Sequence, residues 1–426
     1  MWQTIVNAFR DKEIRKKIFI TFGLLLVFRI GCYIPLPGLD VAALQSAATE
    51  TNDLIGVMNL ISGGSLQNGT LFALGVLPYI NSFIIMQLLT LIIPPLDRLS
   101  KSGEEGRKKI TQITRYVAIV LGVVQSIGIC VTYREYVEQI WGTPWVSYIV
   151  IVVLLTAGST FVMWLSERIT EYGIGNGSSL IIFTGIIATF GSSLISAFGT
   201  VGDNVNNIWY ILGYLAVVIL LFAFIVFIDG AERRVRVNYA KQVKGNKMYG
   251  GQSTVIPIKV NGSGVMPIIF ASSFLMFPSI IVSFFEGTSF ANFWNRYIGM
   301  GTPVYYVFMF LFIIFFAYFY AQIQFNPMDV ARNLQQYGGT IQGVRPGKPT
   351  GEYLAKINNR LTFFGALFLA FIAIIPTFAF NALGQSIGMS SAFSATGMLI
   401  VVSVALELDK QLESQIMMKH YKGFLK

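Results

Sequence analysis

Positive charge in this chain is sorted between alternate loops of a very hydrophobic sequence. Repeated apolar runs of about 20 residues are long enough to cross roughly 30 Å of hydrocarbon as helices. When ten such runs are threaded with both termini on one side, 28 of the 31 Lys and Arg residues fall on that side, and only Arg29, Arg134 and Arg296 lie elsewhere. Because an excess of Lys and Arg marks the cytoplasmic face, the sequence predicts a polytopic membrane protein with both termini in the cytoplasm.

Composition supports this class of protein. The chain is 54% hydrophobic and only 12% charged. Its net charge of +10 follows from the topology and from attraction to anionic lipid headgroups. No small-residue cleavage site follows the first apolar stretch, so we expect this span to be retained. Cys32 and Cys130 fall near outer ends of spans, where we expect ordinary packing rather than a disulfide.

Hydropathy and loop charge place ten transmembrane helices, with boundary errors of about two to four residues. The spans are 18–34, 71–93, 110–132, 146–165, 178–198, 208–228, 265–285, 303–322, 361–380 and 392–408. The outer loop around Gly199 to Asn207 divides them into an N-terminal half, residues 1–200, and a C-terminal half, residues 201–426. Five spans in each half force opposite orientations, the arrangement of an inverted repeat, although no sequence identity between the halves supports one.

Two of the inner loops are unusually long. The loop 229–264 contains two alternating segments, RRVRVNYA and TVIPIKV, separated by a Gly-rich basic stretch, and this pattern predicts a cytoplasmic β-hairpin. The loop 323–360 contains the Pro- and Gly-punctuated run GGTIQGVRPGKPTGEY. A solute carrier has little need for such basic protrusions, and the alternative is a solvated loop that only fixes topology.

The segment 54–66 is apolar but too short to cross the membrane. Its 13 residues give about 20 Å of helix at 1.5 Å per residue. Such a segment lies at the interface or re-enters a protein-lined cavity, and the residues themselves leave both possibilities open. The Gly63–Gly64 pair lets the chain turn back before the second span.

The sequence contains no constellation that indicates catalysis or a cofactor. The single histidine is His420, and no run of His, Asp and Glu has metal-ligand spacing. The run GVRPGKPT, at 343–350, imitates a phosphate loop, but Gln342 and Pro349 stand where that motif needs Gly and Ser or Thr. We also expect no strand–loop–helix unit around it.

Mid-span ionisable residues, which a secondary transporter uses to couple an ion gradient, are not evident. Arg29 is near the outer end of the first span and can snorkel, while Glu407 and Asp409 are near the inner end of the last. Several mid-span positions instead carry small polar side chains. Such residues most often join helices by hydrogen bonds, and a wetted path is the less common alternative.

Several motifs resemble the SecY family, the central subunits of the bacterial protein-conducting Sec channel. They are ALGVLPYINSFIIMQLL (73–89), YGIGNGSSLIIFTGI (172–186), VNGSGVMPIIFASS (260–273) and QGVRPGKPT (342–350), with ISGGSL before the second span. The resemblance runs over essentially the whole chain in the right order. A lone GIGNG would be weak evidence, whereas several motifs of this length are specific.

The resemblance implies two five-span halves clasped around an hourglass pore that opens laterally to lipid. It also implies that 54–66 is a re-entrant plug with Gly63–Gly64 as its flexible exit. The implied plug residues are Leu54, Ile55, Val57, Met58, Leu60, Ile61, Gly63 and Gly64. The implied lateral gate, on spans 71–93 and 265–285, carries the polar residues Asn81, Ser82, Gln87, Ser272 and Ser273.

A ring of aliphatic side chains forms the constriction in this family. The matching positions here are Ile80, Ile84, Ile182, Ile186, Ile269 and Ile400, while Met266 stands where a further aliphatic residue is usual. An apolar ring blocks ions by dewetting, yet it offers no hydrogen bond that would select one polypeptide over another. For each isoleucine taken alone, the alternative is a lipid-facing or packing residue.

The resemblance places an ATPase motor and the ribosome on the two long inner loops. Arg345 matches the family's contact arginine, and Lys241, Lys244 and Lys247 lie at the hairpin tip, where they suit an acidic protein surface or ribosomal RNA. The alternative role for Arg345 is a counter-charge to Glu352. GIGNG is expected to set a tight helix start rather than a phosphate site.

These expectations define a gated channel in the bacterial plasma membrane rather than an enzyme. It would translocate unfolded secretory polypeptides and release hydrophobic segments into lipid, without a cofactor. The expected partners are the small membrane subunits SecE and SecG, the SecA ATPase, the ribosome, signal peptides and precursor proteins, and membrane lipid. The alternative is a secondary transporter for small solutes, and a membrane-embedded enzyme is a more distant third.

Overall fold

A computed structural model gives the arrangement of most of the chain. The described residues are 8–41, 62–137, 143–199, 207–239, 242–244, 247–249, 253–283, 285, 288–299, 302–384 and 395–423. The predicted plug residues Leu54, Ile55, Val57, Met58, Leu60 and Ile61 lie outside them, as does Lys241.

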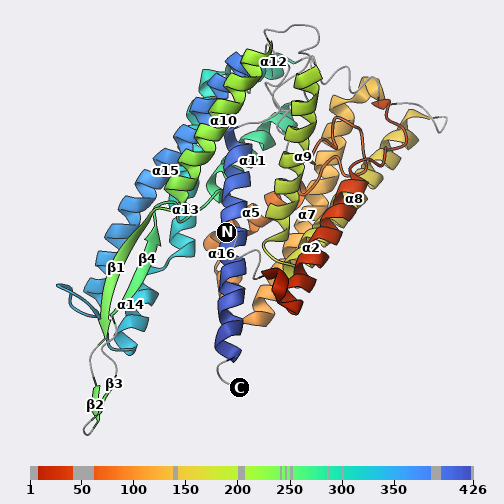
Figure 1. Cartoon of the computed structure of the whole chain (residues 1–426). Coiled ribbons are helices and arrows are strands. Elements are labelled where there is room, and N and C mark those ends of the chain that lie inside the picture. Colours follow the sequence, from red (N-terminus) through yellow and green to blue (C-terminus); the bar gives the residue numbers. More distant parts are fainter. Residues whose placement is uncertain are drawn as a thin grey trace. The chain divides into compact units, whose positions relative to one another are not determined.

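Each of the ten predicted spans falls on a helix (Figure 1). These helices are α2 (Lys12–Gly31), α5 (Leu77–Ile92), α7 (Glu104–Thr132), α8 (Pro144–Tyr172), α9 (Gly177–Gly199), α10 (Asn207–Asp229), α11 (Met266–Ser283), α13 (Pro303–Gln324), α15 (Lys348–Gly384) and α16 (Ala395–Gly423). Six of them, α7 to α10, α13 and α15, are long and apolar enough to cross a membrane. The protein is therefore a polytopic all-α membrane protein.

The remaining helices are short and lie between the spans. They are α6 (Pro94–Lys101), the 3-10 turn η1 (Arg134–Tyr136), α12 (Ser289–Tyr297) and α14 (Pro327–Gln336). Helix α6 is bent by 103° from α5, and Pro94, which has no amide hydrogen to donate, begins it. The bend ends the second span close to the predicted boundary.

Six predicted boundaries differ from the structure by more than four residues: the starts of the first, second, third and ninth spans and the ends of the fourth and tenth. The second span was expected from residue 71, but α5 begins at Leu77 because residues 71–76 form turns, with Gly75 at a φ of 53°. The ninth span was expected from residue 361, but α15 begins at Lys348. Its additional first turns are polar and therefore invisible to a hydropathy criterion.

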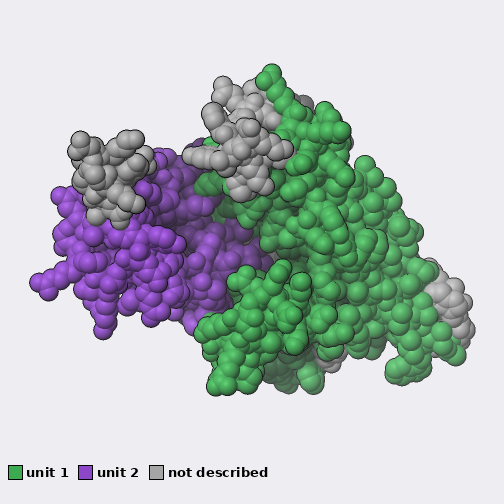
Figure 2. Space-filling view, turned by 90° about the horizontal axis from the view of Figure 1, so that it is seen from below, with its two compact units in different colours: residues 1–216, 273–305, 377–426 green, residues 217–272, 306–376 purple. Residues whose placement is uncertain are grey.

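Contacts divide the chain into two compact units, coloured in Figure 2. The first comprises residues 1–216, 273–305 and 377–426, and the second comprises residues 217–272 and 306–376. The division into halves at residue 200 stays a prediction.

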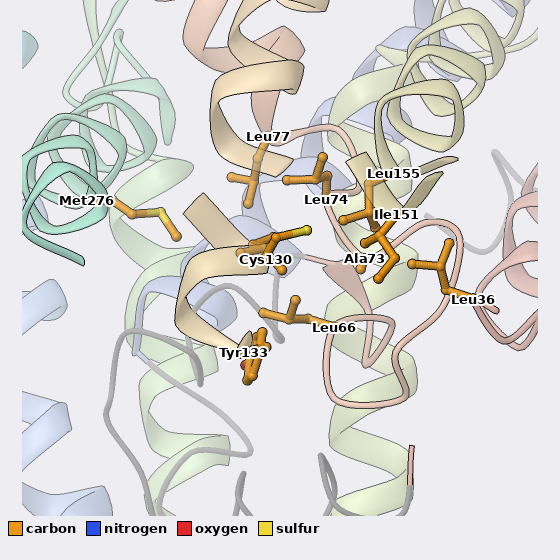
Figure 3. Packing of buried hydrophobic residues seen from close by; sticks show 11 residues of the cluster. Leu36, Leu66, Ala73, Leu74, Leu77, Cys130, Tyr133, Ile151, Leu155 and Met276 are labelled. Atoms are coloured by element: carbon orange, nitrogen blue, oxygen red, sulfur yellow. The ribbon is translucent and has the colours of Figure 1, made fainter. Parts of the chain in front are cut away.

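The core of the first unit holds the turns before α5 against α7 and α8. Leu66 and Leu74 are buried with Cys130 of α7 and Leu155 of α8, and Figure 3 shows their side chains converging. Burial of a large aliphatic side chain contributes roughly 1.5–3 kcal/mol. Cys32 and Cys130 are both buried free thiols, as expected for packing residues.

The second unit contains the predicted β-hairpin. Strands β1 (Glu232–Tyr239) and β4 (Ser253–Lys259) pair antiparallel, with Val235 opposite Ile256, and the tip strands β2 (Gln242–Lys244) and β3 (Lys247–Tyr249) pair beyond them. The prediction of a hairpin is confirmed. One face of β1 packs with α14 and α15 through a cluster that includes Val237, Leu334 and Leu354.

A third strand was not expected from the sequence. Residues Gly339–Ile341 form β5, which pairs with β1 so that Val237 lies opposite Ile341, and the sheet order is β4-β1-β5. The two long inner loops therefore share one sheet.

Candidate functional site: apolar helix faces and a basic sheet

The isoleucines predicted to form the constriction are all buried. Their exposed fractions are 7% for Ile80, 5% for Ile84, 2% for Ile182, 1% for Ile186, 8% for Ile269 and 6% for Ile400. None of them is therefore a lipid-facing residue. Packing within the protein remains the alternative to a ring.

Apolar neighbours on the same helices behave differently. Phe83, next to Ile84 on α5, is 39% exposed, and Ile187, next to Ile186 on α9, is 44% exposed. Adjacent apolar residues on α5 and α9 therefore lie on an exposed and a buried face of the same helix. The sequence positions chosen for the ring are thus on the interior faces of α5 and α9.

Within the first unit, α9 packs against α16, which carries Ile400. A carbon added at Gly175, just before α9, would lie 2.7 Å from Leu408 Cδ2 on α16. The fifth and tenth spans run in opposite directions in the predicted topology. Ile182 is seven residues beyond Gly175 and Ile400 is eight residues before Leu408, so both lie about 10–12 Å from this contact. Ile182 and Ile400 are therefore at a similar depth.

The chain that leads into α5 touches α9 beside this level. A carbon added at Gly63 would lie 2.8 Å from Gly185 Cα and 2.9 Å from Arg29 Nη1. Gly185 is the residue before Ile186, so this turn packs next to a predicted ring position. Gly63 and Gly64 have φ angles of 71° and 87°, which favour glycine.

The two glycines of the predicted plug exit have different surroundings. An added carbon at Gly64 would meet nothing within 4 Å, whereas at Gly63 it would meet backbone. Gly63 is thus required for close packing as well as for its backbone conformation. Sequence reasoning had assigned both to flexibility, and it had treated Arg29 only as a snorkelling residue.

The polar residues predicted for the lateral gate are buried or half-buried. Ser82 Oγ donates to the Tyr79 carbonyl at 2.7 Å, and Ser272 Oγ donates to the Ile269 carbonyl at 3.0 Å. These two hydroxyls therefore bond to their own helices rather than joining neighbouring ones. Ser273 is 7% exposed.

Two gate amides have buried oxygens without a hydrogen-bond partner in the described part of the chain. They are Asn81 Oδ1 and Gln87 Oε1, both on α5. Leaving such a group unsatisfied costs about 1–3 kcal/mol. Neither oxygen therefore joins α5 to a neighbouring described helix by a hydrogen bond.

GIGNG forms a tight connection between α8 and α9. Gly175 has a φ of 86°, and Asn176 Oδ1 accepts a hydrogen bond from the Ser178 amide at 3.1 Å. A carbon added at Gly177 would collide with the Ser166 carbonyl oxygen. These contacts cap and position the start of the helix that carries Ile182 and Ile186.

The strands of the second unit form two sheets that carry basic residues, β4-β1-β5 and, at the hairpin tip, β2-β3. On the face of β1 opposite Val235 and Val237, Arg234 and Arg236 are exposed, and Lys259 on β4 is exposed as well. Lys244 and Lys247 face each other in register at the hairpin tip. The β4-β1-β5 sheet is therefore apolar towards α14 and α15 and cationic on its other face.

Arg345 is exposed in the turn between β5 and α15. Its carbonyl accepts a hydrogen bond from Thr350 Oγ1 at 2.8 Å, which fixes the backbone of the turn. Both Arg345 and Glu352 are described, and no ion pair joins them. The guanidinium is thus available to a partner.

One expectation for the loop 343–350, which imitates a phosphate site, was wrong. The loop does lie between a strand, β5, and a helix, α15, so the prediction that no strand–loop–helix unit surrounds it was wrong. The strand was missed because it has only three residues and depends on pairing with β1. Gln342 and Pro349 still depart from the nucleotide-binding pattern.

Buried apolar faces on the long helices, and a sheet that joins the two long loops, define the class of a polytopic α-helical membrane protein with a folded extramembrane part. Comparison with known proteins agrees. The SecY family model matches residues 70–408. The chain belongs to the SecY family.

Individual relatives cover the whole chain. The protein translocase subunit SecY of Streptomyces galbus is 42% identical over 445 residues, with 100% of both chains covered. That of Thermus thermophilus is 40% identical over 437 residues, covering 100% of this chain and 98% of the relative.

Solved structures share the fold. A protein-conducting channel matches with a TM-score of 0.67 at 19% identity, covering 94% of this chain and 92% of that one. A SecY protein, whose plug domain is described as stabilising the closed state, matches with a TM-score of 0.66 at 20% identity and the same coverage. Sec61 from a canine ribosome–channel complex matches with a TM-score of 0.65 at 18% identity, again over 94% and 92% of the two chains.

Proposed function

We propose that this protein is the channel through which unfolded secretory polypeptides cross the bacterial plasma membrane and from which hydrophobic segments leave sideways into lipid. Family membership over the full length supports the activity. The observation that carries it to particular residues is the burial of all six ring isoleucines, two of which, Ile84 and Ile186, adjoin exposed apolar residues.

The proposed constriction consists of Ile80, Ile84, Ile182, Ile186, Ile269 and Ile400. Apolar side chains close around a translocating chain without a fixed hydrogen-bonding pattern, and they exclude water and ions when no chain is present. Sequence-independent passage is what a general secretory pore requires. The similar depth of Ile182 and Ile400 supports this grouping.

In the same proposal, the halves 1–200 and 201–426 form an inverted pair, and both termini face the cytoplasm. The segment 54–66 is the plug, and α5 and α11 carry the lateral gate at Asn81, Ser82, Gln87, Ser272 and Ser273. The unsatisfied oxygens of Asn81 and Gln87 support a gate whose amides are completed by water or by an entering chain.

The proposed docking surface for the driving partners comprises the β4-β1-β5 sheet, the tip strands β2 and β3, and the turn that holds Arg345. Arg345, Lys241, Lys244 and Lys247 are the proposed contacts for the SecA ATPase or the ribosome, and SecE and SecG are the proposed small membrane subunits. The Sec61 relative was solved in a ribosome–channel complex, which supports a ribosomal partner. The energy for transport comes from these partners, and this chain itself performs no covalent step.

The test places a photo-crosslinking residue at Ile186 and stalls a secretory precursor halfway through translocation. Ile187 is the matched control, because it is the same residue type at the next position and is 44% exposed where Ile186 is 1% exposed. We expect a precursor adduct at Ile186 and lipid adducts at Ile187. Absence of a precursor adduct at Ile186, with uptake of a small solute, would instead establish the secondary transporter.

A further inference from the structure

Arg29 is a half-buried charged residue near the end of an apolar helix, and both terminal nitrogens of its guanidinium donate hydrogen bonds. It lies in the last turn of α2, where Nη1 donates to the Gly63 carbonyl at 3.0 Å and Nη2 donates to the Tyr33 hydroxyl at 3.3 Å. The guanidinium carbon also lies 5.5 Å from the centre of the Tyr33 ring. An arginine near the end of a span can reach the interface by snorkelling, whereas this guanidinium is bonded to the protein, so we ask what these contacts hold in place.

Gly63 is inserted between this guanidinium and α9. The carbon that any side chain would add at Gly63 lies 2.9 Å from Arg29 Nη1 and 2.8 Å from Gly185 Cα. A hydrogen bond from a charged donor is about twice as strong as one between neutral groups. Arg29 therefore ties the Gly63 turn to the end of α2 at the point where this turn also contacts Gly185, the residue before Ile186.

The turn that contains Gly63 is braced as a unit. Ser65 Oγ donates to the Ser62 carbonyl at 2.8 Å, and the Leu66 amide donates to Ser62 Oγ at 3.3 Å. Ser62 and Ser65 are both 0% exposed. Since the residues of this turn are tied to one another, a contact at Gly63 positions all of them.

We propose that Arg29 is a positioning residue that clasps the turn Ser62–Ser65 against α9 and thereby stabilises the closed channel. The proposal rests on the proposed function and deepens it by naming a residue outside the ring, plug and gate. The clasped turn occupies the space beside Ile186. Release of Gly63 by Arg29 is therefore a step that accompanies opening.

Backbone hydrogen exchange of the turn measures the clasp directly. The full chain, with its membrane subunits in vesicles, is compared as wild type, Arg29→Met and Arg29→Lys. Lys keeps the charge but lacks the fork that reaches Gly63 and Tyr33 together. Arg134→Met is the matched control, because Arg134 is an exposed arginine in the turn η1, just after α7.

We expect amides of residues 62–70 to exchange about tenfold faster in Arg29→Met, by an intermediate factor in Arg29→Lys, and at the wild-type rate in Arg134→Met. Unchanged exchange in both Arg29 variants would overturn the clasp. If Arg29→Met does not accumulate in membranes, the Arg29→Lys comparison decides alone.

Ion leak from the same vesicles measures the effect on closure. We expect a higher resting leak in the Arg29 variants and none above wild type in Arg134→Met. Faster exchange without added leak would overturn the role of Arg29 in closure. The proposed channel function is tested separately: it fails if the protein with wild-type Arg29 gives no precursor adduct at Ile186.

Discussion

The interior faces of α5 and α9 and the outer face of the β4-β1-β5 sheet present opposite chemistry. The isoleucines of the helices are nearly inaccessible and offer no hydrogen bond, whereas Arg234, Arg236 and Lys259 on the sheet are exposed cations. Apolar contact accepts chains of any sequence, while charge selects complementary surfaces. In the proposed function, this difference means that cargo is handled without specificity and that partners are recognised with it.

A polar residue in the ring should produce the largest effect. In Ile186→Asn, the buried amide costs about 2 kcal/mol when it has no hydrogen-bond partner. Water that enters the constriction removes this cost, so the fraction of channels with a wetted constriction should rise by about 30-fold. We expect a resting ion leak in vesicles of that order. The control Ile187→Asn should leak little, and an equal leak in both variants would contradict an interior apolar ring.

Charge reversal on the docking surface should have the next largest effect. Arg345→Glu places like charge against an acidic partner, and we expect ATPase-driven translocation to fall by about tenfold. Arg332→Glu, an exposed position on α14, is the control. Resting ion leak should not change in either variant. A similar loss of translocation in Arg345→Glu and Arg332→Glu would mean that the effect comes from the change in overall charge and not from the position of Arg345.

Salt should affect the docking surface but not the apolar ring, with a smaller effect than charge reversal. Raising ionic strength from 0.1 to 1 M shortens the Debye length from about 10 to 3 Å, so we expect binding of the ATPase to the vesicles to weaken by about threefold to tenfold. The adduct of an already stalled precursor at Ile186 should keep its yield, because apolar contact is not screened. Loss of both signals together would show that the regions do not differ in this way.

A conservative change in the ring should have the smallest effect. Ile84→Val removes one methylene from a side chain that is 5% exposed, and we expect translocation of an unmodified precursor to change by less than about twofold. Measured rates for two precursors of different composition should change equally. A precursor-dependent change would mean that the ring reads sequence.

Local patterns were sufficient for most of the fold. Hydropathy located ten helices, because burying about 20 apolar residues in lipid is decided within each segment. Alternation located β4 and β1, and Val235 and Val237 of β1 face the cluster with Leu334. The candidate ring came from the family resemblance, and its residues prove to be buried, whereas the predicted plug residues Leu54 to Ile61 lie outside the described residues.

Contacts between distant segments were not predictable in the same way. Strand β5 has three residues and exists through its hydrogen bonds to β1, about 100 positions earlier, so no local pattern indicates it. The polar first turns of α15 were missed for a related reason, because Leu354 is buried against the sheet rather than in lipid.

The sequence by itself determined the class of membrane protein, its helical spans and the alternation of the hairpin, since each depends on the composition of one continuous segment. Only the tertiary structure decided that Arg29 donates to Gly63, that Gly63 packs on Gly185 and that the two inner loops share a sheet. Those features depend on where separate segments meet. The meeting point is set by close packing and hydrogen-bond geometry, which no single segment encodes.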